Sequence, residues 1–340
     1  MKRLTAVVLL VLGGLAPSPP PVDMAQVLAE APAPALGDYH LFADAGARVP
    51  NARLTPYALN TPLFSDYASK HRFVFVPAGQ SARYTATGVV DFPVGTVLVK
   101  TFAYPAATAE HFIETRLLIR KASGWVPNTY VWNAAQDQAV LKRAGARVAV
   151  DYQGRAIDYA VPNVNQCKQC HLAGEAVTPI GPRARNLNGV FAYPGGPENQ
   201  LAHWTRTGLL AGAPPFAKIA ATPRWDDTRA PLGGRARAYL DANCGHCHSR
   251  AGFAGNSGLY LDFEEQDPAH WGVGKRPVAA GRASAGLSFA IAPGDPDASI
   301  IVHRMASTEP GIMMPQFGRT VTHDEGVALI RAWIKAMPRN

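Results

Sequence analysis

The sequence predicts a multidomain protein in which an all-β domain, of the sandwich or jelly-roll kind, precedes a mainly α-helical region. Short alternating runs separated by turn signals fill residues 37–160, whereas loops and helix-like patterns follow from residue 161. The 31 glycines and 29 prolines among 340 residues also favour many turns. We therefore expect a β domain at residues 37–160, a segment of loops and short helices at residues 161–225 that carries a first binding motif, and a mainly helical domain at residues 230–340 that carries a second.

The clearest strand is predicted at residues 113–120. Ile113, Thr115, Leu117 and Ile119 alternate there with charged side chains, namely Glu114, Arg116 and Arg120. A period of two predicts a strand with one buried and one polar face. Further strands are predicted at residues 72–76, 96–102, 129–132 and 147–152. No motif stands out in this domain, and its titratable candidates Asp66, His71 and His111 are typical of surface positions.

Three helices are predicted after residue 160. The first covers residues 199–210, and the second covers residues 234–243. The third begins near Thr322, because Thr322 and Glu325 have the spacing of a capping box. Apolar residues then follow at helical spacing, at Val327, Ile330, Ile334 and Met337.

The N-terminus has the layout of a secretory signal peptide, which we place at residues 1–22. Lys2 and Arg3 precede an apolar run at residues 4–16, and a group of prolines follows. The run is shorter than the roughly 20 residues that span a bilayer, and no other stretch is as apolar. We therefore expect a periplasmic protein without a transmembrane helix in the mature chain, with an uncleaved anchor as the alternative.

All four cysteines lie in two strings, Cys167-Lys-Gln-Cys170-His171 and Cys244-Gly-His-Cys247-His248. Cys-x-x-Cys-His is the attachment signal of c-type haem, in which two thiols add to the porphyrin vinyl groups and the adjacent imidazole ligates the iron. The sequence therefore predicts two covalently bound haem c groups, with His171 and His248 as iron ligands.

Three alternatives for the cysteines are weaker. A zinc site is disfavoured because 74 positions separate Cys170 from Cys244, far more than in a zinc ribbon. Disulfide frameworks belong mainly to small domains that lack a sufficient core. A thioredoxin-like site needs alternating strands and helices around the motif, which the sequence does not show.

The second string resembles that of a class I cytochrome c domain. A predicted helix precedes Cys244, and Met314-Pro315 lies 66 residues after His248, followed by the C-terminal helix. The resemblance implies that Met314 is the distal iron ligand and that the first and last helices pack together. The remaining candidates for the distal ligand are Met313, Met305 and His303, and the candidates for the helix crossing are Tyr239, Leu240 and Trp333.

The first string is less complete. Residues 180–188 resemble the Gly-Pro stretch that wraps a haem edge, where Arg183 or Arg185 could pair with a propionate. No Met lies between His171 and Cys244, so the sixth ligand is His203, a distant residue or none. Residues 159–166 look extended, so no helix is expected before Cys167.

Four segments, at residues 59–68, 92–102, 162–171 and 293–299, together resemble a family of exported bacterial dihaem c-type cytochromes. The resemblance implies two covalent haems and periplasmic export, and it implies no substrate. We expect a protein that transfers electrons rather than a stand-alone enzyme. A dihaem redox enzyme, such as a peroxidase with an open first haem, is the alternative, and a ligand-binding module with a redox tail is a third. No catalytic residue is assigned.

The expected partner is a redox donor or acceptor protein. The formal charge of +8 falls to about +6 without Lys2 and Arg3, and this balance is compatible with an anionic partner. No run of Lys and Arg interleaved with aromatic residues is present, which argues against nucleic acid.

Overall fold

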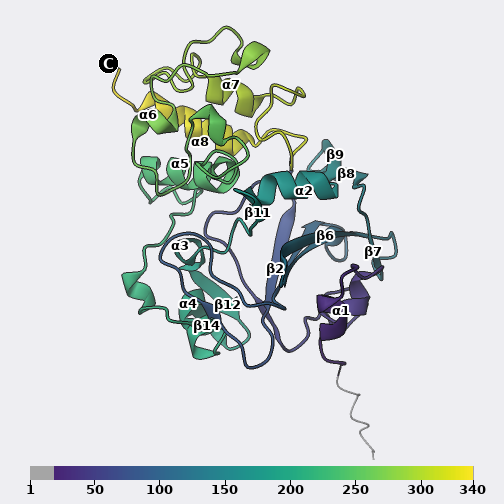
Figure 1. Ribbon diagram of the computed structural model, residues 1–340. Helices are drawn as coiled ribbons and strands as arrows, with labels where there is room; N and C mark the ends of the chain where they lie inside the picture. Colours follow the sequence, from purple (N-terminus) through teal and green to yellow (C-terminus); the bar gives the residue numbers. More distant parts are fainter. Residues whose placement is uncertain (1–18, 340) are drawn as a thin grey trace, which may run out of the picture.

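The computed structural model describes residues 19–339, which form a lower and an upper lobe (Figure 1). Residues 1–18 of the expected signal peptide lie outside the described residues. The lower lobe contains the large sheet, the upper lobe contains the C-terminal helices, and helix α2 lies between them (Figure 1).

The lower lobe is built on a six-stranded antiparallel sheet with the order β1-β2-β4-β5-β6-β7. Its strands are β1 (Leu54–Pro56), β2 (Ser69–Phe75), β4 (Val97–Tyr104), β5 (His111–Lys121), β6 (Gly124–Trp132) and β7 (Ala139–Leu141). The predicted strand at residues 147–152 is β8 (Ala146–Tyr152), which pairs with β9 (Arg155–Val161) in a separate hairpin. All five predicted strands are therefore confirmed, but they form one sheet and a hairpin rather than a sandwich or jelly roll.

Both faces of the sheet are covered. Val97, Val99 and Leu117 pack on one face against α1 (Met24–Leu28) and the short helix η1 (Leu36–Tyr39). A β-bulge shifts the register between Phe102 and Ala103. The bulge turns Ile113 to the cluster that contains Phe102, away from the face of Leu117, so the predicted grouping of Ile113 with Leu117 is wrong.

The opposite face of the sheet is covered by a later part of the chain. Leu98 and Leu118 belong to a cluster with Leu187, Leu201 and Trp204. The covering elements are α3 (Ala184–Leu187), β12 (Val190–Tyr193), β13 (Gly196–Asn199), α4 (Gln200–Arg206) and β14 (Leu210–Ala211), and β14 pairs with β3 (Ala82–Arg83). This part of residues 161–225 is therefore packed on the β domain.

The upper lobe has more loop than helix. Its elements are α5 (Leu232–Leu240), the π-helical turn η3 (Asp241–Gly245), η4 (Gly255–Ser257), α6 (Pro268–Trp271), η5 (Gly281–Ser284), α7 (Ile300–Ala306) and α8 (Asp324–Lys335). Helices α5 and α8 pack together, and Tyr239, Leu240 and Trp333 share their core.

The prediction of a mainly α-helical, cytochrome c-like region is wrong. Helix makes up only 23% of the structure, and the large antiparallel sheet dominates it. The chain between α5 and α8 turns repeatedly at glycines in left-handed conformations, as at Gly272 (φ 106°) and Gly294 (φ 75°), and such turns interrupt helices.

The first cysteine string lies in helix α2 (Val164–His171), contrary to the extended chain expected before Cys167. The side chain of Asn163 accepts a hydrogen bond from the Gln166 backbone, and the Gln166 side chain accepts one from the Asn163 backbone. This capping box starts the helix at Val164. Two short elements follow, β10 (Leu172–Ala173) and β11 (Ala176–Val177), and η2 (Phe216–Lys218) lies further on.

Residues 60–68 fasten the two lobes together. The Phe64 backbone donates to Asn243 of the upper lobe (2.8 Å), and the Phe64 ring stacks on His323 with 4.2 Å between the ring centroids. The carboxylate of Asp66 accepts hydrogen bonds from the backbone of Thr320 (2.7 Å) and Val321 (3.0 Å). Asp66 is therefore a buried structural residue rather than the surface residue expected.

Candidate functional site

His171 is the last residue of helix α2, and the backbone of Thr178 fixes its ring through the Nδ1 atom. Nδ1 lies 2.7 Å from the carbonyl oxygen of Thr178, and the Thr178 backbone donates to the His171 carbonyl (2.8 Å). Because a carbonyl only accepts, Nδ1 must carry the proton, and the lone pair is left on Nε2. Burial, followed by the charge of Lys100, lowers the pKa of His171 to about 3, so the ring is neutral.

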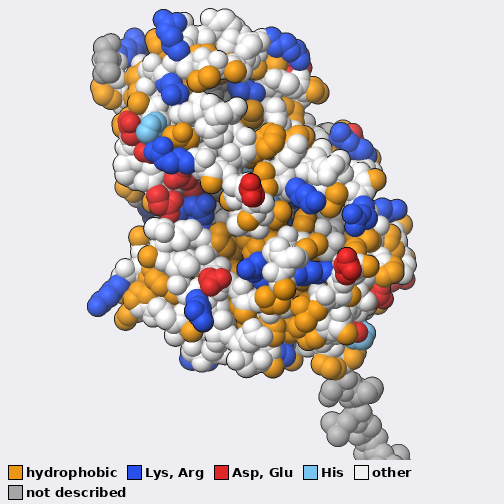
Figure 2. Space-filling model, in the orientation of Figure 1, with side chains coloured by type: hydrophobic (Ala, Val, Ile, Leu, Met, Phe, Trp, Pro, Cys, Tyr) orange, Lys and Arg blue, Asp and Glu red, His pale blue; other side chains and the backbone are white. Residues whose placement is uncertain are grey.

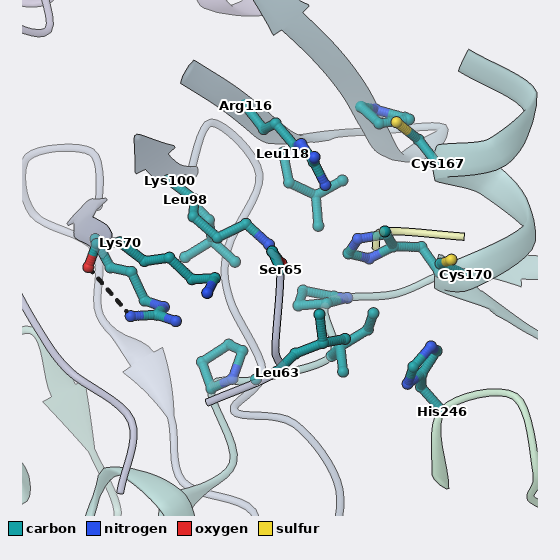
Figure 3. Close-up of a pocket in the computed structure, with 18 of the residues that line it drawn as sticks. Leu63, Ser65, Lys70, Leu98, Lys100, Arg116, Leu118, Cys167, Cys170 and His246 are labelled. Atoms are coloured by element: carbon teal, nitrogen blue, oxygen red, sulfur yellow. Dashed lines mark hydrogen bonds between the residues drawn. The ribbon is translucent and has the colours of Figure 1, made fainter. Parts of the chain in front are cut away.

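A narrow cavity of about 150 Å³ lies between this helix and the large sheet. Cys167, Cys170 and His171 line it from α2, and Leu98 and Leu118 line it from the sheet (Figure 3). Long basic side chains from the sheet also reach into it, as Figure 3 shows for Lys70 and Lys100. The first string thus lies at the junction of the β domain with the rest of the chain.

The sheet wall of this cavity is strongly basic. Lys70, Arg72, Lys100 and Arg116 all line it. Burial, together with the neighbouring charges of Arg116 and Arg72, lowers the pKa of Lys100 to about 7. Burial and the same cluster lower the pKa of Lys70 as well. Both amines therefore lie where a positive charge is poorly compensated.

The second string fixes its histidine through a different partner. The hydroxyl of Ser257 donates to the Ala254 carbonyl (2.6 Å), so its oxygen accepts from Nδ1 of His248 at 3.1 Å. Nδ1 is therefore protonated, and Nε2 again keeps its lone pair. Burial lowers the pKa of His248 to about 4.

A second cavity, of about 460 Å³, lies beside this string. Its size is within the range of roughly 300–1,000 Å³ that is usual for small-molecule sites. Cys244, Cys247 and His248 line it, together with Met305 and Met314. The other two sequence candidates for the distal ligand, Met313 and His303, are not part of its described lining.

Two arginines hold the loop that presents Met314. The Met314 backbone donates to the Arg304 carbonyl (3.0 Å), and Nε of Arg304 donates to the Ile312 carbonyl (2.8 Å). Nη2 of the buried Arg319 donates to the Met314 carbonyl (2.9 Å) and the Ser307 carbonyl (2.8 Å). The position of Met314 therefore depends on these guanidinium groups.

The two cavities adjoin each other. Cys170, His246, Pro315 and Phe317 line both of them. The interaction between the two thiols lowers the pKa of Cys170 and raises that of Cys247, so the two strings lie near each other at these residues. Nδ1 of His246 is buried and has no hydrogen-bond partner among the described residues.

The remaining sequence candidates are engaged elsewhere. His203 stacks on Tyr193 (3.5 Å between the ring centroids), pairs with Glu198 (2.7 Å), and is not part of the described lining of the first cavity. His71 of β2 pairs with Glu110, and His111 is exposed.

Arg183 and Arg185, which the sequence offered as propionate partners, already face carboxylates. Both pair with Asp241, at 3.5 Å and 2.8 Å respectively, and with Glu264 at 3.4 Å. The basic residues that the sequence analysis missed are Lys70, Arg72 and Lys100. The available signal in the sequence was the spacing of Lys70 and Arg72, which are two positions apart and therefore share one face of a strand.

These residues fit a covalently attached haem at each string. Each Cys-x-x-Cys-His string lines a cavity, and each histidine has an oriented ring with a free Nε2 atom, as an iron ligand requires. All four cysteines are free. The described residues contain no group of three or more His, Cys, Asp or Glu side chains placed to hold a metal ion by themselves, which is what the zinc alternative needs.

The wider molecule adds two findings. No helix among residues 19–339 is long and apolar enough to cross a membrane. No family model, no curated protein and no solved structure matches the chain.

Proposed function

We propose that the protein is an exported dihaem c-type cytochrome that transfers electrons. The observation that supports this most strongly is the repeated arrangement at His171 and His248. In both strings Nδ1 is held by an oxygen atom, Nε2 is free, and two thiols line the same cavity. An ordinary buried histidine needs no such thiol pair beside it.

The residues have distinct tasks in this proposal. Cys167 and Cys170 attach the first haem, and Cys244 and Cys247 attach the second. His171 and His248 each offer Nε2 to iron, and Met314 offers its sulfur at the second site. A bound haem c supplies an iron that cycles between Fe(III) and Fe(II). Leu98 and Leu118 add apolar side chains to the otherwise basic sheet wall of the first site.

The shared wall supports electron exchange between the two sites. Cys170, His246 and Phe317 belong to both cavities, and Cys247 lines the second one. Groups attached through these thiols would therefore be neighbours. This proximity suits a chain that accepts an electron at one site and releases it at the other.

A second candidate function is a redox enzyme that binds a small ligand, such as peroxide, at the first haem. The observation in its favour is the shortage of iron ligands in the first cavity. Among the described residues, the lining contains no Met, and its only imidazole besides His171 is that of His246. If His246 does not ligate the iron, that site keeps an open position.

The test uses two paired substitutions in the full chain, produced with the cell's haem-attachment machinery. Cys167→Ala/Cys170→Ala and Cys244→Ala/Cys247→Ala should each retain one covalent haem, measured by pyridine haemochrome. The first variant should keep the near-infrared Fe–Met band, and the second should lose it. Lys168→Ala/Gln169→Ala, which changes only the spacer of the first string, is the matched control and should retain both haems.

Two outcomes overturn the proposal: a wild-type protein without covalent haem, or a cysteine variant that still has two. Carbon monoxide separates the two candidate functions. Binding of carbon monoxide to neither haem supports an electron carrier, and rapid binding at the first haem with peroxide turnover supports the enzyme.

A further inference from the structure

Four basic side chains lie together on the large sheet, and three of them lie directly opposite one another in neighbouring strands. In the strand register, Arg72 of β2 lies directly opposite Lys100 of β4, and Lys100 lies directly opposite Arg116 of β5. Lys70 lies two residues before Arg72 and lines the same cavity. We call these four residues the basic row. Like charges directly opposite each other in a sheet are destabilising, so the row needs a compensating group.

The protein itself supplies one carboxylate to the row. Glu114 accepts two hydrogen bonds from Arg116 (2.5 and 2.9 Å). The hydroxyl of Tyr159 donates a further hydrogen bond to the same carboxylate (2.6 Å). Lys70 and Arg72 donate only to backbone carbonyl oxygens in the described structure. Four basic side chains therefore face one carboxylate, which is already paired with Arg116.

The other nearby groups do not restore the balance. Asp66 acts on Lys70 from a distance, and its oxygens are occupied by Thr320 and Val321. The ring of Phe102 lies 5.1 Å from the Lys100 ammonium and 4.3 Å from the Arg116 guanidinium, which is a weak cation–π contribution. The row is thus compact and short of negative charge.

The position of the row identifies what it would bind. Lys70 and Lys100 extend into the cavity from the sheet, on the side opposite Cys170 and His246 (Figure 3). In haem c the thioether bonds are on one edge of the porphyrin, and the two propionates are on the opposite edge. A haem attached to α2 would therefore turn its carboxylates toward the sheet.

We propose that the basic row is the propionate-binding wall of the first haem site, with Lys70, Arg72 and Lys100 as the carboxylate partners. This inference rests on the proposed function and gives the β domain a task within it. Charge-assisted hydrogen bonds to carboxylates are the strong kind. Arg183 and Arg185 cannot bind the propionates in place of the basic row, because both already pair with Asp241 and Glu264.

A cation beside a haem stabilises the reduced form, because reduction adds a negative charge. Removal of a charge from the basic row should therefore lower the reduction potential of one haem only. Lys100→Met keeps most of the side-chain volume and removes the charge, and Lys100→Arg keeps the charge. The matched control is Lys142→Met, at an exposed position outside both cavities.

The experiment is a spectroelectrochemical titration of the purified dihaem protein and each variant. We expect Lys100→Met to lower one midpoint potential and leave the other in place, and we expect Lys100→Arg and Lys142→Met to match the wild type. If Lys100→Met does not accumulate, Lys70→Met answers the same question with a half-buried residue. Two covalent haems with unchanged potentials in the variant would overturn this inference alone, whereas absence of covalent haem from the wild type would overturn the proposed function.

Discussion

At the scale of single residues, the two histidines are fixed by oxygen atoms of unrelated origin. A backbone carbonyl, that of Thr178, orients His171, and a side-chain hydroxyl, that of Ser257, orients His248. Both partners leave the same nitrogen free. The chain therefore orients both imidazole rings in the same way by different local contacts.

Arg319 should position Met314 without contacting iron. Its Nη2 atom donates to the carbonyl oxygens of Met305, Ser307 and Met314, so Arg319→Gln leaves one buried and two half-buried acceptors without a donor. Each unsatisfied buried group costs roughly 1–3 kcal/mol, enough to loosen the loop. We expect the near-infrared Fe–Met band to weaken while both haems stay attached.

The control for this prediction is Arg331→Gln. Arg331 of α8 forms an exposed ion pair with Asp297, and loss of this pair should leave the Fe–Met band unchanged. Arg319→Lys should keep part of the band, because a lysine can still reach some of the carbonyls. A full-strength band in Arg319→Gln would show that the loop is held without Arg319.

At the scale of elements, α2 depends on its N-terminal cap. The helix has eight residues, which is too short to be stable from propensity alone. The reciprocal bonds of Asn163 and Gln166 satisfy backbone donors at its start. The cap thus holds Cys167 and Cys170 on one turn of the helix.

Asn163→Ala should loosen this helix locally. Loss of such a cap costs about 1 kcal/mol, which corresponds to roughly fivefold faster amide exchange in α2. Hydrogen-exchange mass spectrometry of peptides that cover residues 164–171 measures the change, and peptides from α8 are the internal reference. Asn163→Ser should behave as the wild type, since Ser also caps. Unchanged exchange in Asn163→Ala would mean that α2 is held by its packing alone.

At the scale of the whole molecule, the lobes are joined by residues 60–68 and by His323. His323 is buried, stacks on Phe64, and accepts or donates a hydrogen bond with Tyr239 (3.0 Å). Figure 2 shows Lys and Arg side chains among hydrophobic ones on the face between the lobes. The lobes must therefore stay docked for the first cavity to keep His246, Pro315 and Phe317 in its lining.

His323 should make this docking sensitive to acid. Burial lowers the pKa of His323 to about 4 from 6.5, while Glu325 and Asp324 act to raise it and Lys70 acts to lower it. As the pH falls, His323 therefore binds a proton in the unfolded chain before it does so in the folded protein. The contribution of His323 is complete above pH 6.5 and is lost progressively down to pH 4, by about 3 kcal/mol in total.

The measurement is the free energy of unfolding of the purified protein between pH 7 and pH 4, compared between the wild type and His323→Gln. The variant should lose less stability over this interval. His111→Gln, at an exposed histidine, is the control and should follow the wild type. Equal pH slopes for wild type and His323→Gln would contradict the assignment.

The sequence was most informative where a pattern is local. The strands alternate visibly, and Cys-x-x-Cys-His identifies the two strings without any tertiary information. It was misleading in the C-terminal part, where a resemblance suggested a mainly helical region and the glycine turns prevent one. The start of α2 could have been predicted from Asn163 and Gln166. The opposition of Arg72, Lys100 and Arg116 depends on strand register, which the sequence does not specify for strands far apart in the chain.

The central claim is that both strings attach haem, and the intact mass of the purified mature protein tests it most directly. We predict a mass that exceeds that of the polypeptide by two haem groups and that survives denaturation in acid, since thioether bonds are covalent. A denatured chain with the mass of the polypeptide alone would contradict the account.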